Sequence, residues 1–220
     1  MPEANGMPGQ WASYINRIEE GGSGNTPDVL PQSVQATNDG AGTLTDLGGG
    51  VYTYEFSIDV MNVTEPVEVL WEPGLTHKLG LEIRLEDPNT GEDKDPLNPV
   101  WQFVPDGSDV MDTKSIANLD SCNDCHQKLA IHGDHRNNTE YCVTCHNPGT
   151  IDQDTADSVD MAYMTHSIHL GADRAIPYII YGFRDSPHDY SGVHYPGDIT
   201  NCAVCHTESA DTPDGGDWMT

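Results

Sequence analysis

The alternation of apolar and polar residues predicts short β-strands in the first half of the chain. Residues 51–60 (VYTYEFSIDV) are β-branched and aromatic with partial alternation, and residues 68–71, 78–85 and 100–103 have the same character. Turn-forming residues separate these segments at positions 46–50, 73–74 and 87–91. Short strands at this spacing are typical of a small antiparallel barrel or sandwich. We therefore expect a mainly β N-terminal domain over residues 31–111.

The segments on either side of this region have a different character. Residues 1–30 are polar, and we expect an N-terminal extension there, with residues 11–15 (WASYI) as a short helix or a docking strand. Residues 112–220 predict a loop-rich domain with few short helices. The best helix candidate is 157–170, with Asp157 or Ser158 as the N-cap and Gly171 as the terminating residue.

Candidate chemistry in this second domain comes from the cysteines. All six belong to three copies of the pattern C-x-x-C-H, at 122–126, 142–146 and 202–206. This is the attachment signature of c-type haem, in which two thiols bond covalently to the porphyrin and the next histidine ligates the iron. The pattern predicts three covalently bound haem c groups. The attachment residues are Cys122, Cys125, Cys142, Cys145, Cys202 and Cys205, and the proximal iron ligands are His126, His146 and His206.

Other uses of cysteine explain the pattern less well. A structural zinc site needs two Cys pairs around one metal, and three pairs do not divide into such sites. A disulfide framework explains the even cysteine count but not the histidines. The chain has only 10 histidines in 220 residues, so a histidine after every pair is a specific signal. A thioredoxin-like motif would be a single pair beside a βαβ pattern, which is missing from the sequence.

Composition and charge agree with haem binding. Only 36% of the residues are hydrophobic, and 22 glycines and 15 prolines indicate many loops, so the protein core should be thin unless porphyrins add apolar bulk. The formal charge of −27 argues against binding nucleic acid or an anionic membrane, and favours cations or a basic partner. The sequence contains no membrane-spanning stretch. We see no signal peptide, yet covalent haem attachment implies export, so we expect a mature form or a piece of one.

Six further histidines in the second domain are candidates for the distal iron ligands. His166 and His169, three residues apart on the predicted helix, can serve two different haems, and His132 precedes a glycine in a tight segment. The alternatives are His135, His188 and His194, for which a surface role or contact with a propionate is the competing explanation. We expect Met161 and Met164 in the core and a structural role for His77. Bis-histidine ligation leaves no open iron site and suits electron transfer.

The motifs and their flanks resemble the outer-membrane decahaem cytochromes of the OmcA/MtrC family. The resemblance lies in residues 121–126, 129–133, 141–150, 164–169 and 195–202, and more loosely in 45–52 and 75–77. It implies a β-barrel-like domain leading into a multihaem domain, and distal ligand roles for His132, His166 and His169. Family members carry more haem motifs, so the resemblance also implies a fragment or a short relative, and we expect a fragment.

The expected function is electron transfer through closely spaced bis-histidine haems. The resemblance implies a protein at the cell surface, outer membrane or extracellular side, with the periplasm as the alternative. Its partners would be redox proteins, other multihaem cytochromes, and extracellular acceptors such as metal oxides, metal complexes or flavins. The alternatives are a subunit of a conductive filament or other oligomer, and a reductase with one open iron site. An acidic loop at residues 92–95 is a candidate calcium site, although it lacks EF-hand spacing.

Overall fold

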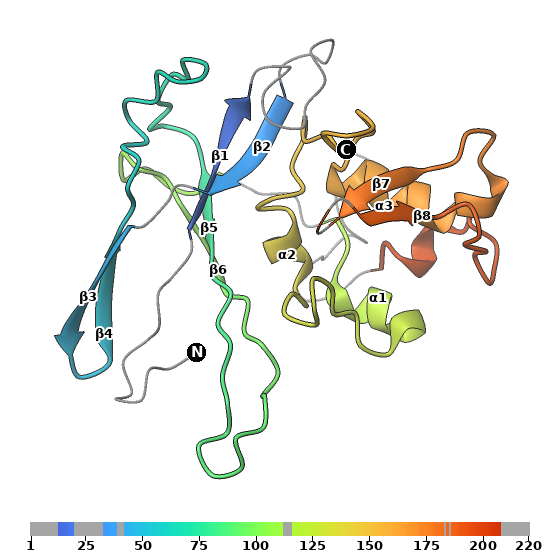
Figure 1. Ribbon diagram of the computed structural model, residues 1–220, viewed down its shortest axis with the longest axis horizontal. Helices are drawn as coiled ribbons and strands as arrows, with labels where there is room; N and C mark the ends of the chain where they lie inside the picture. The colour runs from blue at the N-terminus through green and yellow to red at the C-terminus, as the bar shows by residue number, and fades with distance from the viewer. Residues whose placement is uncertain are drawn as a thin grey trace.

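The computed structural model describes residues 13–19, 33–38, 42–111, 116–182, 184 and 186–207. Figure 1 shows two parts side by side, with β1–β6 in one part and the helices and β7–β8 in the other. The predicted domain boundary at 111/112 adjoins residues 112–115, which are outside the described ranges, as are most of the predicted N-terminal extension and the polar C-terminal residues from 208 onward. No helix of the described residues is long and apolar enough to cross a membrane.

The N-terminal part consists of antiparallel strand pairs, which confirms the predicted β character. Strand β1 (Tyr14–Glu19) pairs with β2 (Ser33–Asn38), β3 (Thr43–Gly48) with β4 (Val51–Glu55), and β5 (His77–Gly80) with β6 (Val100–Phe103). Each sheet of the described residues has only two strands, and they form no closed barrel. Strand β1 includes part of the 11–15 cluster, and its partner lies in the region predicted as the β domain.

Three of the predicted strands differ from the structure. The strand expected at 78–85 ends at Gly80, and only an isolated bridge from Ile83 to Leu97 follows within that segment. Strand β4 ends at Glu55 because a turn follows, in which Asp59 accepts hydrogen bonds from the backbone N–H groups of Met61 and Asn62. Residues 68–71 form no strand. They lie between Pro66 and Pro73, which cannot donate to a sheet, and the Val69 N–H closes a local loop onto the Val63 carbonyl at 3.0 Å.

The C-terminal part carries short helices, as predicted, and one hairpin that was not predicted. The helices are α1 (Leu119–His126), α2 (Thr139–Cys142) and α3 (Met161–His169), with 3-10 turns η1 (Gly171–Asp173) and η2 (Cys202–Val204). The hairpin joins β7 (Ile179–Gly182) to β8 (Ser186–Asp189). Helix α3 is shorter than the expected 157–170, because the N-cap is Asp160, whose carboxylate accepts from the N–H groups of Ala162 and Tyr163.

The hydrophobic core is thin in the described part of the chain. Its buried hydrophobic side chains are Val104 and Tyr178, and Tyr178 is fully buried. The Tyr178 ring packs at 6.0 Å from Tyr163 of α3 and from Tyr190 after β8, and its hydroxyl donates to the Ser158 carbonyl at 2.7 Å. This aromatic cluster fixes the β7–β8 hairpin against α3.

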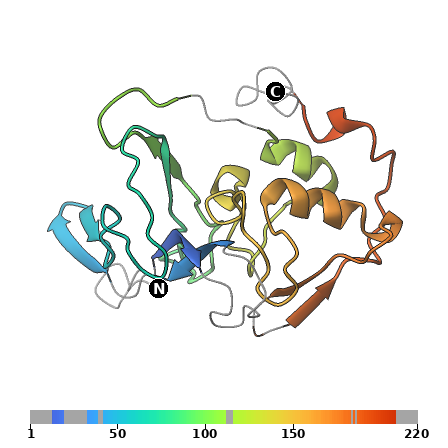
Figure 2. The same cartoon turned by 90° about the horizontal axis from the view of Figure 1, so that it is seen from above.

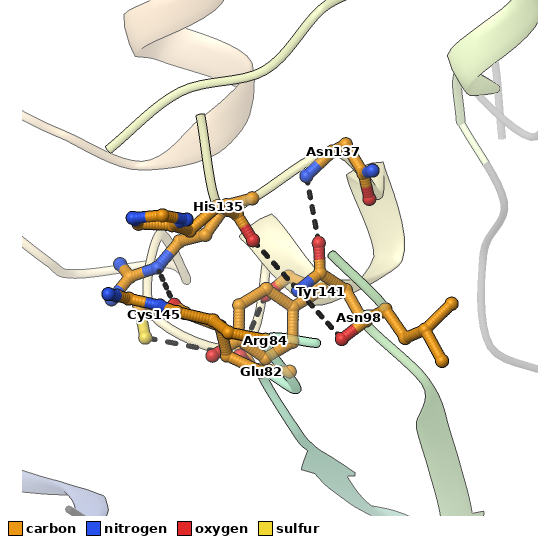
Figure 3. A network of polar contacts seen from close by, with 10 residues as sticks. Glu82, Arg84, Asn98, His135, Asn137, Tyr141 and Cys145 are labelled. Carbon is orange, nitrogen blue, oxygen red and sulfur yellow. Dashed lines mark hydrogen bonds and ion pairs between the residues drawn. The ribbon is translucent and has the colours of Figure 1, made fainter. Parts of the chain in front are cut away.

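Polar contacts join the β part to the segment that leads into α2 (Figure 3). The side chain of Asn98 donates to the His135 carbonyl at 3.1 Å and accepts from the Asn137 N–H at 2.8 Å. Arg136 pairs with Glu82 at 2.8 Å. Gly80 allows β5 to approach α2, because a Cβ at this position would lie 2.6 Å from the Tyr141 ring. These contacts make the sheet the support for the 131–145 segment.

Replacement of Asn98 by alanine should destabilise this junction. Asn98 is only 5% exposed, so the change leaves the His135 carbonyl and the Asn137 N–H without their partner. We expect a loss of about 1–3 kcal/mol in the free energy of unfolding, measured by urea denaturation. Asn89→Ala, in an exposed turn, is the matched control and should change stability by less than about 0.5 kcal/mol. Equal effects of the two variants would contradict the assignment.

The ion pair at this junction predicts a dependence of stability on pH. Burial alone would raise the pKa of the Glu82 carboxyl, but hydrogen bonds from Arg136 and Arg84 outweigh it and hold that pKa below its usual range. A carboxyl with a lowered pKa in the folded state stabilises the fold above its unfolded pKa of about 4.3, and this contribution is lost as the pH falls further. The free energy of unfolding of Glu82→Gln should therefore be lower than that of wild type at neutral pH, and the two values should converge in acid. The free energy of unfolding of Glu68→Gln, a change at an exposed position, should equal that of wild type at every pH.

Candidate functional site

Each C-x-x-C-H pattern lies on a helical turn. Cys122 and His126 lie within α1, whereas the second and third motifs begin at the end of α2 and in η2. The backbone N–H of His146 bonds to the Cys142 carbonyl at 2.9 Å, and that of His206 to the Cys202 carbonyl at 3.0 Å. The first cysteine and the histidine of each motif are thus four residues apart on a helical turn, which places them on the same face. None of the six cysteines forms a disulfide.

Side-chain caps hold the first two turns in place. Asn118 accepts a hydrogen bond from the Ser121 N–H at 2.9 Å at the start of α1, and Asn138 accepts from the Glu140 N–H at 2.9 Å at the start of α2. The first and third motifs are also joined, because the Ser121 hydroxyl bonds to the Thr207 hydroxyl at 2.5 Å. Burial raises the pKa of the Cys122 thiol, and the nearby Cys205 raises it further, so these two motifs are neighbours.

Each proximal histidine faces one of the three predicted distal histidines. The ring centroids are 6.0 Å apart for His126 and His169, 6.1 Å for His146 and His132, and 6.1 Å for His206 and His166. Helix α3 supplies the neighbouring ring for two different motifs, because it carries both His166 and His169. In Figure 2, α3 lies next to α1 and α2, so it brings the separate motifs together.

The spacing of these pairs fits a metal between the two rings. A metal–imidazole nitrogen bond is about 2 Å long, so two rings on opposite sides of one ion have nitrogens about 4 Å apart and centroids about 6 Å apart. Among the described residues, no three histidine, cysteine or acidic side chains gather around one point as ligands of a single ion. The arrangement is therefore one of imidazole pairs, each beside a Cys pair. These residues fit covalent haem c.

Hydrogen bonds to the backbone anchor one ring atom, Nδ1, in four of these histidines. The Nδ1 atoms of His146, His166, His169 and His206 each lie 2.8 Å from a backbone carbonyl, those of Val159, Ala162, Thr165 and Ile116 respectively. A proton on Nδ1 leaves the Nε2 lone pair free to bind a metal. Burial lowers the pKa of His146 more than the Val159 carbonyl raises it, which favours the neutral ring that metal binding requires.

The backbone around His132 adopts an uncommon conformation. His132, Gly133 and Asp134 have φ angles of 54°, 74° and 64°, all in the left-handed region. The turn is closed by the bridge between Ile131 and Arg136, and Arg136 is anchored by Glu82 of the β part. Non-glycine residues in this region are typical of sites where the surrounding structure imposes the geometry. The β part thus helps to hold His132 opposite His146.

The remaining candidates lie elsewhere. His188 is exposed on β8, where its ring stacks on Tyr190 at 6.5 Å, and His194 is exposed in the following loop. His135 contributes its carbonyl to Asn98 at the junction of the two parts. His77 packs between Trp71 and Phe103, in keeping with a structural role. In the 92–95 loop, Lys128 pairs with Asp95, and Lys94 pairs with Asp87 at 3.3 Å.

One neighbour of the site could not be singled out from the sequence. The ring of Tyr195 lies 6.0 Å from that of His169 in an edge-to-face arrangement. Tyr195 belongs to the 195–202 segment, which resembles the family, but nothing in its spacing relates it to α3.

Comparison with known proteins identifies the class. Residues 114–220 match the family model "Outer membrane cytochrome MtrC/MtrF-like, domains II/IV", and residues 4–96 match "OmcA-like N-terminal domain". With the motifs and the imidazole pairs, these matches define a multihaem c-type cytochrome. The chain belongs to the OmcA/MtrC family of outer-membrane multihaem cytochromes.

Individual relatives agree with this assignment. Multiheme cytochrome MtrC of Shewanella baltica (strain OS185) is 25% identical over 180 residues, which are 80% of this chain and 23% of that protein. The crystal structure of the outer membrane decaheme cytochrome OmcA superposes with a TM-score of 0.70 at 32% identity, covering 91% of this chain and 31% of that one. The structure of MtrC from Shewanella baltica OS185 shares the fold, with a TM-score of 0.57 at 19% identity over 97% and 33% of the two chains. The chain thus spans about a quarter to a third of the length of these relatives.

Proposed function

We propose that this chain binds three haem c groups covalently and conducts electrons between redox proteins and extracellular acceptors at the cell surface. The observation that carries the proposal is the set of three imidazole pairs, each with centroids about 6 Å apart and each containing one motif histidine. Bound haem supplies one-electron chemistry at its iron. Metal oxides, soluble metal complexes, flavins and other multihaem cytochromes are the proposed acceptors and partners, by analogy with the family.

Each site combines one motif with one distal histidine. The first consists of Cys122, Cys125, His126 and His169. The second consists of Cys142, Cys145, His146 and His132, and the third of Cys202, Cys205, His206 and His166. In each site the two thiols would tether the porphyrin, and the two imidazoles would hold its iron. This pairing supports electron transfer over a reductase with an open iron site, because every motif histidine has a partner.

Protein residues around the sites influence the strength of the imidazole ligands and the stability of the oxidised form. Backbone carbonyls hold the Nδ1 protons of four axial rings, which makes those ligands better donors to the iron. The charge of −27 should stabilise the oxidised, more positive form of each site. The β part contributes no ligand, but it positions His132 through the ion pair between Glu82 and Arg136.

The number of haems is the first test. Intact mass and a pyridine haemochrome assay should give three covalent haems per chain. The double variant Cys142→Ala, Cys145→Ala should retain two, because only the second motif loses its thiols. A wild-type count other than three, or a variant count equal to wild type, would contradict the proposal.

Removal of a distal histidine should open one site and leave the others unchanged. In His132→Ala, His166→Ala or His169→Ala, one haem of three should become high-spin and bind carbon monoxide when reduced. The matched controls are His135→Ala, His188→Ala and His194→Ala, which should keep fully low-spin spectra. Carbon monoxide binding by a control, or its absence in all three ligand variants, would refute the ligand assignment.

The reduction potentials provide an independent test. Two imidazole ligands and a strongly acidic chain both favour ferric iron, so a potentiometric titration should give midpoints below 0 mV against the hydrogen electrode. Raising the ionic strength should shift the midpoints to more positive values, since salt screens the carboxylates. Midpoints all well above zero would contradict the proposal.

A further inference from the structure

The three imidazole pairs differ in the angle between their ring planes. The rings of His132 and His146 are inclined by 30°, and those of His166 and His206 by 33°. The rings of His126 and His169 are inclined by 73°. Two of the proposed sites therefore have nearly parallel axial ligands, and the first has nearly perpendicular ones.

Helix α3 alone does not explain this difference. It carries one member of a parallel pair, His166, and one member of the perpendicular pair, His169. The Nδ1 atom of each lies 2.8 Å from the carbonyl four residues earlier in the helix, so α3 holds both rings in the same manner. The cause must lie in what contacts these rings from outside the helix.

The proximal ring of each parallel pair is fixed from a distant segment. His146 is hydrogen-bonded to the Val159 carbonyl and His206 to the Ile116 carbonyl. For the ring of His126, no such hydrogen bond is found within the described ranges. The angle between the two rings of the first site therefore depends more strongly on the side chains that pack against its distal ring, His169.

That packing comes from Tyr195. Its ring meets the ring of His169 at 80° with centroids 6.0 Å apart, which is a favourable edge-to-face geometry. The Tyr195 side chain also lies near the thiols of Cys205 and Cys125, which belong to the third and first motifs. It thus contacts the distal ring of one site while bordering the attachment residues of another.

The orientation of axial rings affects the iron they bind. An imidazole interacts through its π electrons with one of two iron d orbitals, selected by the plane of the ring. Parallel rings act on the same orbital and separate the two in energy, which stabilises ferric iron with its single vacancy in that set. Perpendicular rings act on different orbitals and leave them nearly equal, so ferric iron gains less. Axial ligation is one of the main means by which a protein sets a haem potential.

We propose that Tyr195 is a positioning residue that holds the His169 ring nearly perpendicular to that of His126, and so gives the first haem site the most positive potential of the three. This inference rests on the proposed bis-histidine ligation. Reduction adds one electron to the site, and no bond is made or broken. The first site is then the one that retains an electron longest within the chain.

Electron paramagnetic resonance of the oxidised holoprotein tests the geometry directly. Nearly parallel imidazoles give a rhombic low-spin ferric signal, and nearly perpendicular ones give a strongly anisotropic signal with a large maximum g value. The expected spectrum contains two rhombic signals and one large-g signal of equal intensity. In a stepwise reductive titration with dithionite, the large-g signal should disappear first. Three rhombic signals, or loss of the large-g signal last, would overturn the inference.

Variants at position 195 test the role of the tyrosine. In Tyr195→Leu the large-g signal should be lost and replaced by a rhombic one, and the most positive midpoint should shift to a more negative value. Tyr195→Phe keeps the ring and should keep both the signal and the midpoint. Tyr181→Leu makes the same change at an exposed position of β7 and should resemble wild type. Tyr195→Met, whose unbranched and flexible side chain also lacks a ring, replaces Tyr195→Leu if that variant assembles poorly.

The outcomes separate this inference from the function on which it rests. Fewer than three haems, or a high-spin optical spectrum in the wild type, would refute bis-histidine ligation. Three low-spin haems with a large-g signal that survives in both Tyr195→Leu and Tyr195→Met would refute only the role of Tyr195.

Discussion

The structure depends on bringing two imidazoles to within about 6 Å of each other from segments that are distant in sequence. The attachment motifs are local, but a motif histidine provides only one axial position. In the proposed sites the second ligand would come from another segment, which is α3 for His126 and His206 and the left-handed turn at His132 for His146. Helix α3 is therefore the central element of the C-terminal part, because it contributes a ring to two of the three pairs.

This constraint explains why so small an apolar core is sufficient. The described part of the chain buries Val104 and Tyr178 as its hydrophobic core, whereas large side chains such as Ile131 and Tyr163 remain substantially exposed. Order comes instead from capped helical turns, carbonyl-bound imidazoles and the polar junction around Asn98. A polypeptide with few hydrophobic residues can fold in this way when its ligands are covalently tied to a large apolar cofactor.

The β part contributes to the site through support. Gly80 permits the close approach to Tyr141, and Glu82 holds Arg136, which closes the turn that presents His132. The fold similarity to OmcA covers 91% of this chain and therefore includes both parts. In this arrangement, changes in the β part can alter a haem site without contacting its ligands.

The sequence alone determined the attachment chemistry, because a C-x-x-C-H turn is short enough for its spacing to dictate its geometry. It also predicted the β character of the first half and the helix that carries His166 and His169. As candidate distal ligands it favoured these two residues and His132 over His135, His188 and His194. It did not predict the β7–β8 hairpin or the absence of a strand at 68–71, since prolines and long-range packing override local propensity there. Only the tertiary structure decided which histidine faces which motif and at what angle. These features depend on contacts between segments whose separation in the chain carries no information about their distance in space.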